Sequence, residues 1–427
     1  MLYRTLSAPL SVQIEITDDC TQRCTHCYRA CQHVGKYTPK HLNPDQAVRL
    51  VEELAKWKVM SVCFTGGEPL MFQKTLEAGI RRASELGLVV YCNSNLQPLK
   101  PETARFFKQH KVGILTSLLS HEPETHDRIV QSRGAHERLL KKIRLLTDMG
   151  VLTSANMVVR KDNACHVYDT GKLAHSLGVL RFSATKVAPS PSTEYRNYRA
   201  APNQIRASMN TLLQLQDETG LWVEILETYP LCFIQDLEKY NQFLRRNCTA
   251  GVFNCSISPD GTVRPCAHAD MTYGNLFDQS LQECWLAMQD WRNGDYLHPI
   301  CRECQWLMQC SGGCRMDAKI YYGDIRERDP LMSKPENVRP APKKSNVVDL
   351  PVEMQFRREV GTRAEEFGGV VKFNDELVFL NDRGYKTIQQ LLAANRKFDW
   401  QEVEVEGITP AEKKQFFEVL FTKQMFY

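Results

Sequence analysis

The placement of the cysteines constrains this chain more than any other feature. Sixteen cysteines occur in 427 residues, and most of them form two groups. The first group comprises Cys20, Cys24, Cys27 and Cys31, and the second lies within residues 248–314. Thiols at short, fixed spacings are typical of metal or catalytic sites in reducing compartments, whereas structural disulfides are typical of secreted chains. We therefore predict a cytoplasmic protein in which the grouped cysteines bind metal.

Length and composition indicate a soluble protein of two or three domains. The chain is longer than a usual single domain, and its 43% apolar and 24% charged residues lie in the globular range. Because 54 basic residues nearly balance 50 acidic ones, we expect no nucleic-acid partner. No apolar run approaches the length of a membrane span, and the first ten residues lack a secretory signal. We therefore expect no association with a membrane.

Strand and helix patterns alternate over the first half of the chain. Residues 11–17 have the period of a half-buried strand, and an apolar helical stripe follows the cap at Asn43 and Pro44. Further strands, separated by helices, are predicted at 59–64, 88–92, 112–117, 152–159 and 181–184. About six successive βα units predict an α/β fold, either a parallel barrel or a doubly wound sheet. Functional residues gather at the carboxyl ends of the strands in both architectures.

The first cysteine motif directly follows the first predicted strand. Cys20, Cys24 and Cys27 are separated by three and then two residues. Three thiolates are one short of a closed tetrahedral site, which suits a metal centre with an open position. The alternative is a zinc knuckle completed by His26 or Cys31. The motif resembles that of the radical SAM superfamily, with His26 in the place of an aromatic residue. This resemblance, over residues 11–190, implies a [4Fe-4S] cluster whose fourth iron binds S-adenosylmethionine.

A second motif, Gly66-Gly67-Glu68-Pro69, ends the second predicted strand. Alone it could be a turn into a helix, but its place after the cysteine loop matches the superfamily's second motif. Glycines allow close approach of the backbone to a ligand, and a carboxylate there can accept hydrogen bonds from the cosubstrate's ammonium group. At the fourth strand Leu119 replaces a common acidic contact. The resemblance implies further cosubstrate contacts from Asn93, Ser94, Asn95 and Ser117.

The later cysteines form a second, denser set. Cys301, Cys304, Cys310 and Cys314 leave two, five and three residues between them, and the turn signal 259–261 separates Cys255 from Cys266. The alternative is a pair of zinc ribbons. Residues 248–330 resemble the SPASM extension of radical SAM enzymes, which carries two auxiliary [4Fe-4S] clusters. The resemblance implies that Cys248, Cys255, Cys266 and Cys314 hold the first, and that Cys301, Cys304 and Cys310 hold part of the second.

The second auxiliary cluster lacks its eighth family cysteine, because Met332 stands at that position. A thioether is a weak iron ligand compared with a thiolate. The cluster would therefore have an open iron, a displaced ligand such as Cys284, or be absent. An open iron could bind a substrate thiolate and lower its pKa. We expect most of the remaining cysteines to be buried free thiols, and these are Cys31, Cys63, Cys92, Cys165, Cys232 and Cys284. His268 is a candidate acid or base, with an exposed loop histidine as the alternative.

The last residues form a separate small domain. A Pro- and Lys-rich segment without periodicity precedes it, and a hairpin is predicted from strands 369–373 and 377–380, followed by three short helices. This order resembles the PqqD-like leader-peptide recognition domains, which are small α+β domains of winged-helix type. Such a domain binds an extended leader by strand addition. The alternative is a packing module without a ligand.

These patterns predict four parts of the chain. They are a partial (β/α)6 TIM-type barrel at 1–225, a SPASM domain at 226–332, a linker at 333–352 and a PqqD-like domain at 353–427. The resemblances imply an enzyme whose 5′-deoxyadenosyl radical installs a thioether, C–C or C–heteroatom crosslink in a ribosomally made precursor peptide. The implied partners are that peptide with its leader and a flavodoxin-type or other low-potential electron donor.

Three alternatives remain at this point. One is oxidation of a protein residue, as sulfatase-maturing relatives perform, although Ala267 replaces the aspartate that those relatives tend to carry. Another is a small-molecule substrate such as a tetrapyrrole, against which the C-terminal domain argues. The last is a zinc-stabilised binding protein with no catalysis, which would be colourless where an iron–sulfur enzyme would be brown.

Overall fold

The chain forms two compact units, Met1–Ala341 and Pro342–Tyr427. The computed structural model describes residues 2–28, 38–190, 195–341, 348–357, 359–373, 376–405 and 407–427. Cys31, which the sequence offered as an alternative ligand, lies outside these residues. Part of the predicted linker belongs to the first unit, because the Arg339 amide donates to the Gln235 carbonyl at 2.7 Å. None of the described helices is long and apolar enough to cross a membrane.

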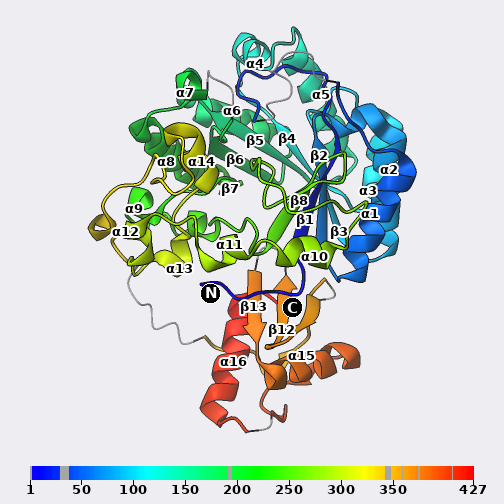
Figure 1. Ribbon diagram of the computed structural model, residues 1–427, viewed down its shortest axis with the longest axis vertical. Helices are drawn as coiled ribbons and strands as arrows, with labels where there is room; N and C mark the ends of the chain where they lie inside the picture. Colours follow the sequence, from blue (N-terminus) through cyan, green and yellow to red (C-terminus); the bar gives the residue numbers. More distant parts are fainter. Residues whose placement is uncertain are drawn as a thin grey trace. The chain divides into compact units, whose positions relative to one another are not determined.

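A nine-stranded sheet forms the framework of the first unit (Figure 1). Its order is β7-β6-β5-β4-β3-β2-β1-β8-β9, in which β1 to β8 are parallel to their neighbours and β9 is antiparallel to β8. The strands are β1 (Ser11–Thr17), β2 (Ser61–Gly66), β3 (Val89–Asn93), β4 (Gly113–Ser117), β5 (Thr153–Val159), β6 (Arg181–Lys186), β7 (Trp222–Glu224), β8 (Asn254–Ile257) and β9 (Val263–Arg264). The predicted α/β fold with a parallel sheet is confirmed. Because the first seven strands are neighbours in chain order, their carboxyl ends share one edge.

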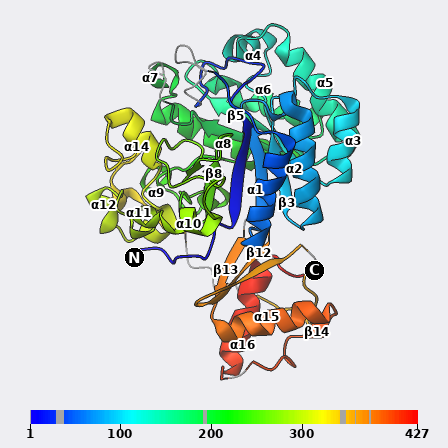
Figure 2. The same ribbon diagram turned by 45° about the vertical axis from the view of Figure 1, so that its right-hand side comes forward.

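Helices between the strands cover one face of this sheet (Figure 2). They are α1 (Pro44–Lys56), α2 (Gln73–Glu85), α3 (Pro101–Gln109), α4 (Pro123–Val130), α5 (Ala135–Asp148), α6 (Val167–Ser176), α7 (Tyr195–Tyr198) and α8 (Pro202–Thr219). Asn43 begins α1 as predicted, since its side-chain oxygen accepts a hydrogen bond from the Gln46 amide at 2.8 Å.

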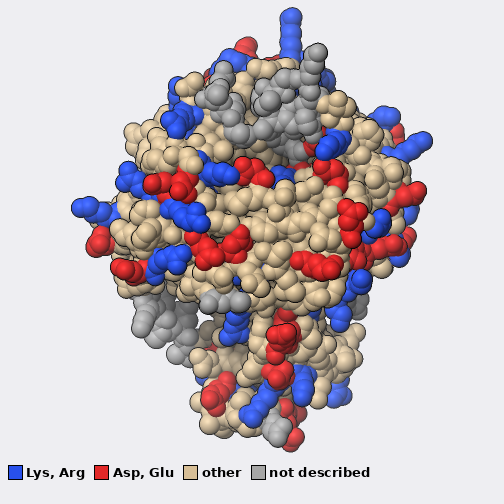
Figure 3. Space-filling view, in the orientation of Figure 1, with Lys and Arg blue, Asp and Glu red and all other residues tan. Residues whose placement is uncertain are grey.

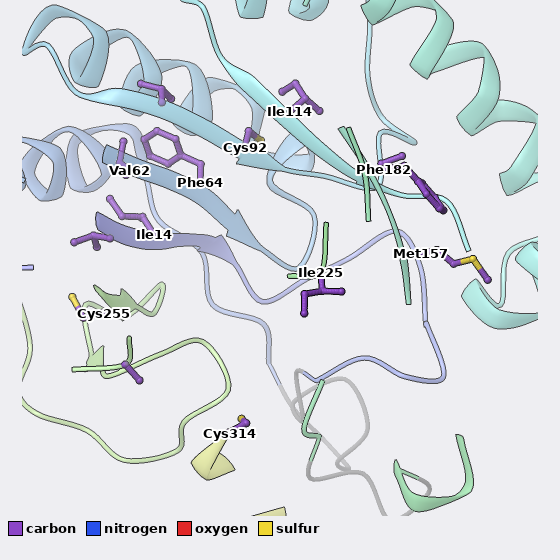
Figure 4. Packing of buried hydrophobic residues seen from close by; sticks show 14 of the residues in the cluster. Ile14, Val62, Phe64, Cys92, Ile114, Met157, Phe182, Ile225, Cys255 and Cys314 are labelled. Carbon is purple, nitrogen blue, oxygen red and sulfur yellow. The ribbon is translucent and has the colours of Figure 1, made fainter. Parts of the chain in front are cut away.

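Alternation along the strands decides which side chains face the helices. Ile14, Val62, Phe64 and Ile114 are buried against them, as Figure 4 shows. A Cβ atom on Gly79 of α2 would lie 2.9 Å from the ring of Phe64, so this helix packs closely on the strand. Full burial of one such ring contributes about 1.5–3 kcal/mol. Residues between these positions point to the opposite face, where the functional side chains gather.

The cysteine-rich segment joins the main sheet through β8, which pairs with β1. It continues through short helices, in a region coloured yellow-green to yellow in Figure 1. Buried Arg292 stabilises this segment, because its guanidinium donates to the carbonyls of Gly251, Trp285 and Leu286. The helices are α9 (Leu231–Ile234), α10 (Leu281–Leu286), α11 (Gln289–Asn293), α12 (Pro299–Arg302), α13 (Leu307–Cys310) and α14 (Arg315–Tyr322).

The second unit is built on a three-stranded antiparallel sheet, in the order β11-β12-β13. Its strands are β11 (Gly361–Glu365), β12 (Gly368–Phe373) and β13 (Glu376–Leu380), and a separate pair joins β10 (Glu353–Met354) to β14 (Phe398–Asp399). Pairing of β12 with β13 confirms the predicted hairpin.

Helices α15 (Asp382–Ala394) and α16 (Pro410–Thr422) complete the described part of the second unit. The prediction of three helices was wrong for these residues, because the intervening segment pairs as β14 instead. The core includes Val371, Ile388, Phe417 and Leu420.

On the face shown in Figure 3, basic and acidic side chains are interspersed, in keeping with the nearly balanced charge.

Candidate functional site

The first three cysteines lie in the loop after β1. Cys20, Cys24 and Cys27 are partly exposed, and the Cys27 amide donates to the Cys24 carbonyl at 3.0 Å. Burial raises the pKa of Cys24, and the charges of Cys27 and Cys20 raise it further. The three thiols are therefore close enough to repel one another as thiolates. A positively charged iron centre would remove that repulsion, so the set fits the group predicted for it.

Gly66 and Gly67 hold the end of β2 against the chain that leads into this loop. The Gly67 amide donates to the Thr17 carbonyl at 2.6 Å, and the Glu68 amide donates to the Asp19 carbonyl at 2.7 Å. A Cβ atom on Gly67 would lie 1.9 Å from the Asp19 oxygen. We expected the glycines to approach a ligand. In the structure, their close neighbour is the backbone immediately before Cys20.

The carboxylate of Glu68 ties β2 to the end of β3. It is fully buried and accepts hydrogen bonds from the Leu70 amide at 3.0 Å, the Ser94 hydroxyl at 2.7 Å and the Asn95 amide at 2.7 Å. Burial raises the pKa of Glu68 to about 7, while these three donors oppose the rise. Its neighbour Pro69 begins a short 3-10 helix, Pro69–Phe72. Glu68 thus positions Ser94 and Asn95 beside the cysteine loop.

Asn95 connects this carboxylate to the first cysteine. Its side-chain amide donates to the Cys20 sulfur at 3.5 Å and to the Thr21 hydroxyl at 3.0 Å. Hydrogen bonds to a ligand sulfur tune an iron–sulfur centre. The structure therefore brings together four residues that the sequence singled out, namely Cys20, Glu68, Ser94 and Asn95.

Asn93 and Ser117 end their strands at the same edge. Asn93 pairs in register with Leu115, two residues before Ser117, so both belong to one face of the sheet. Ser117 in turn pairs with Asn156 of β5, whose side-chain oxygen accepts hydrogen bonds from Ser183 and Thr185, each at 2.9 Å. Sequence reasoning missed Asn156. Its signal is the polar alternation of Ser154 and Asn156 within an otherwise buried strand.

His268 lies between the first cysteine loop and the later cysteines. Its ring meets the ring of Tyr28 edge-on, with centroids 4.7 Å apart, and its Nε2 lies 3.7 Å from Glu227 Oε1. The His268 side chain is 17% exposed, so the alternative of an exposed loop histidine was wrong. Burial raises the pKa of Cys248 and of Cys314, and the charge of Glu227 adds to both rises. Glu227 thus lies near His268 on one side and near Cys248 and Cys314 on the other.

Three of the four cysteines predicted for the first auxiliary cluster, Cys248, Cys266 and Cys314, lie close together. Burial raises the pKa of Cys266 to about 12, and the charge of Cys248 adds to the rise. The charge of Cys248 also raises the pKa of Cys314. Cys255 has a different neighbour. Burial raises its pKa, and the charge that raises it further is that of Cys284. Figure 4 shows the Cys255 sulfur directed away from Cys314. The fourth predicted ligand is thus separated from the other three.

The cysteines predicted for the second auxiliary cluster share a small cavity. Cys301, Cys304 and Cys310 line it together with Met332 and Cys232. Among the described residues, no three His, Cys, Asp or Glu side chains stand close enough to bind one metal ion. A [4Fe-4S] cluster distributes its thiolates over four irons, so it accepts thiols that stand farther apart than the ligands of one ion. The lining is compatible with such a cluster.

A buried charge network connects β6 to the cysteine-rich segment. The Lys186 ammonium lies 2.5 Å from Asp317 Oδ2 and 3.8 Å from Asp329 Oδ2, and the Tyr195 hydroxyl donates to Asp317. Although burial alone would lower the pKa of Lys186, the two carboxylates raise it well above its ordinary value. Asp329 also accepts a hydrogen bond from the Cys314 amide at 2.8 Å. Sequence reasoning missed this network, because nothing local pairs Lys186 with residues so distant in the chain.

Two family models match parts of the first unit. The model of the radical SAM superfamily matches residues 14–174, and that of the SPASM iron-sulfur cluster-binding domain matches residues 248–305. The AdoMet-dependent heme synthase of Methanosarcina barkeri is 25% identical over 340 residues, covering 76% of this chain and 96% of the relative. The PqqA peptide cyclase of Ruegeria pomeroyi is 28% identical over 342 residues, covering 77% and 88%.

Solved structures share the fold. Streptococcus suis SuiB bound to the precursor peptide SuiA superposes with a TM-score of 0.60 at 18% identity, covering 76% of this chain and 75% of SuiB. Native anSMEcpe with bound AdoMet gives 0.61 at 18% identity, covering 76% and 94%. The fold, the strand-end motifs and the matched domains define a class of enzyme. This chain is an S-adenosylmethionine-dependent iron–sulfur enzyme of radical SAM type with a SPASM domain.

Proposed function

We propose that this enzyme installs a crosslink in a ribosomally made precursor peptide. The observation that carries the proposal is the second compact unit, Pro342–Tyr427, whose three-stranded sheet has β11 and β13 as its outer strands. An extended leader peptide can add to such an edge by main-chain hydrogen bonds. The likeness of this chain to PqqA peptide cyclases, over 77% of its length for the Ruegeria pomeroyi relative, supports a peptide substrate.

The proposed sites follow from the cysteine sets. Cys20, Cys24 and Cys27 would hold the cluster that binds S-adenosylmethionine, with Gly66 to Pro69, Asn93 to Asn95 and Ser117 at the cosubstrate. Two auxiliary clusters would be held by Cys248, Cys255, Cys266 and Cys314 and by Cys301, Cys304 and Cys310. The close grouping of Cys248, Cys266 and Cys314 supports three of the first four assignments more directly than that of Cys255.

When bound, the first cluster and S-adenosylmethionine supply a 5′-deoxyadenosyl radical, and an auxiliary cluster supplies an acceptor for one electron. A crosslink removes two hydrogens from the peptide, one as an atom taken by that radical and one as a proton whose electron goes to the acceptor. We propose that His268, whose Nε2 lies 3.7 Å from Glu227 Oε1, receives the proton. A flavodoxin-type or other low-potential donor would reduce the first cluster. We also infer that the sequential strands curve into a partial barrel, which excludes water from the radical.

The protein's own residues prepare this site before any ligand binds. Glu68 fixes the β3 end beside Cys20 through Asn95, and the glycine pair fixes the backbone at Asp19. Preorganised donors and a fixed backbone need no rearrangement when the ligand binds. Lys186, paired with Asp317, holds the helix that follows Cys314 against β6.

A second candidate function is oxidation of a tetrapyrrole. It is favoured by the similarity to AdoMet-dependent heme synthases, at 25% identity to the Methanosarcina barkeri relative and 26% to that of Nitratidesulfovibrio vulgaris. The second compact unit gives a physical reason to prefer a peptide, because a small molecule needs no strand-adding sheet.

Mass measurement tests the proposal. Short peptides encoded beside the chain's own gene are incubated anaerobically with the reduced enzyme and S-adenosylmethionine. A precursor that loses two hydrogen masses supports the crosslink. The matched control is the Cys20→Ala/Cys24→Ala/Cys27→Ala variant, which should leave the peptide unchanged. Unaltered peptides together with turnover of a tetrapyrrole would contradict the proposal and favour the second candidate.

A further inference from the structure

Cys232 faces the same cavity as the incomplete second set of cysteines. It lies in the short helix α9, is 8% exposed, and lines the cavity with Cys301, Cys304, Cys310 and Met332. Sequence analysis assigns no role to Cys232, since it precedes the cysteine-rich motifs and has no ligand spacing of its own. The fold alone brings it to this position.

The four thiols lie near one another because Cys232, Cys301, Cys304 and Cys310 line the same small cavity. Burial raises the pKa of Cys301 to about 11, and the charges of Cys310, Cys232 and Cys304 add to the rise. Burial also raises the pKa of Cys232 to about 11, with the charge of Cys310 contributing. Three of the thiols thus act on Cys301, and Cys310 also acts on Cys232. Such a set would be unfavourable as bare thiolates and is typical of a cluster site.

The backbone around Cys310 is arranged to stabilise a thiolate. The Leu231 amide, one residue before Cys232, donates to the Cys310 sulfur at 3.3 Å. The amides of Gly312 and Gly313 also lower the pKa of Cys310, against the larger effect of burial. Amides directed at a ligand sulfur are a recurrent feature of iron–sulfur sites. Helix α9 therefore contributes to this cavity through its backbone as well as through Cys232.

The segment after Asp329, where the eighth cysteine was expected, packs directly against α9. The Ser333 hydroxyl donates to the Cys232 carbonyl, and the Met332 sulfur lies 3.7 Å from the Cys301 sulfur. Position 332 and Cys232 thus reach one cavity from two neighbouring segments. Cys284, the displaced ligand considered from the sequence, lies beside Cys255 instead and does not line this cavity.

We propose that Cys232 is the fourth protein ligand of the second auxiliary cluster, in place of the cysteine that Met332 replaces. The inference rests on the proposed auxiliary clusters. It leaves this cluster with four thiolates and no open iron, so a substrate thiolate would have no iron to bind there. Met332 then packs against Cys301 as an apolar neighbour of the cluster.

Iron content and electron paramagnetic resonance of the full chain test this assignment. The Cys20→Ala/Cys24→Ala/Cys27→Ala variant serves as the parent, because it lacks the ligands of the first cluster and keeps all of those proposed for the auxiliary clusters. With two intact clusters it should bind about eight irons. Adding Cys232→Ser should remove about four of them, or leave a cluster whose resonance shifts when 2-mercaptoethanol is added. The parent's resonances should not shift with this thiol.

Two further variants separate ligation from packing. Adding Cys284→Ala, a change at another buried cysteine, should leave iron content and resonances as in the parent. Combining Cys232→Ser with Met332→Cys should restore the iron and the insensitivity to thiol. A Cys232→Ser variant with the parent's iron, resonances and insensitivity would overturn the inference while leaving the auxiliary clusters standing. A parent without auxiliary iron would contradict both.

Discussion

Replacing Gly67 with alanine is expected to disrupt the first cluster selectively. The added Cβ would lie 1.9 Å from the Asp19 carbonyl oxygen, where real Cβ contacts are essentially never shorter than 3.0 Å. The Asp19 backbone must therefore retreat by about 1 Å, or the end of β2 must do so. Either movement breaks the 2.7 Å hydrogen bond from the Glu68 amide to Asp19, which contributes about 1 kcal/mol. Because Cys20 follows Asp19 directly, its thiol moves with it.

The effect of Gly67→Ala can be measured as the rate of S-adenosylmethionine cleavage and as the iron content of the protein. A displacement of about 1 Å at a catalytic group can reduce a rate on the order of 100-fold. We therefore expect S-adenosylmethionine cleavage by Gly67→Ala to fall by at least that factor. Its iron content should fall by about four per chain, the share of one [4Fe-4S] cluster. The auxiliary clusters should remain, because their cysteines lie on other segments.

Gly87→Ala provides the matched control. Gly87 has a φ of +80°, yet a Cβ atom there would meet no atom within 4 Å. This variant carries the backbone strain of a left-handed residue, about 1–2 kcal/mol, without a steric clash. It should retain all of its iron and its cleavage rate. If Gly67→Ala behaved like Gly87→Ala, the argument that the glycine pair fixes the cysteine loop would be refuted.

Three other perturbations test separate parts of the site. Burial raises the pKa of Glu68 from 4.5 to about 7, so Glu68 contributes stability that is lost as pH rises from about 4.5 to 7. In thermal unfolding, the Glu68→Gln variant should therefore lose less stability than the wild type over this pH window. Parallel stability curves for the two proteins would contradict this expectation. Lys186→Met leaves buried carboxylates uncompensated and should lower the free energy of unfolding by about 3–5 kcal/mol in anaerobic denaturation. Adding Asp317→Leu should restore part of this loss. Equal stability of the single variant and the wild type would refute the reasoning. His268→Phe keeps a ring beside Tyr28 but loses the contact with Glu227, so peptide modification should fall by about 10²–10⁴-fold at unchanged iron content; an unaltered rate would exclude an acid–base role.

Strands, helices and turns could be predicted from the sequence, because each depends on interactions between residues a few positions apart. The strand before Gly66 and the helix after Asn43 follow from periodicity and capping within a few residues. Parallel strands in chain order then bring the cysteine loop, Glu68 and Asn95 to one edge without further information. The hairpin of β12 and β13 was likewise predictable from two apolar runs around a polar turn.

Features that depend on distant segments could not be predicted from one sequence. Pairing of β8 with β1 makes the cysteine-rich segment continuous with the main sheet. The ion pair of Lys186 with Asp317 and the approach of Cys232 to Cys301 both join residues with no shared motif. Spacing rules recognise ligands that share a loop, and they miss a ligand that tertiary packing contributes. The separation of Cys255 from Cys314 has the same origin, because the orientation of a strand decides which face carries its thiol.

Deuterium transfer tests the central claim most directly. A precursor peptide made with deuterated amino acids is incubated anaerobically with the reduced enzyme and S-adenosylmethionine, and the 5′-deoxyadenosine formed is analysed by mass spectrometry. If this enzyme takes a hydrogen atom from a peptide carbon, the 5′-deoxyadenosine gains one deuterium and the peptide loses two hydrogen isotopes in the same proportion. Unlabelled 5′-deoxyadenosine with an unchanged peptide would contradict the account.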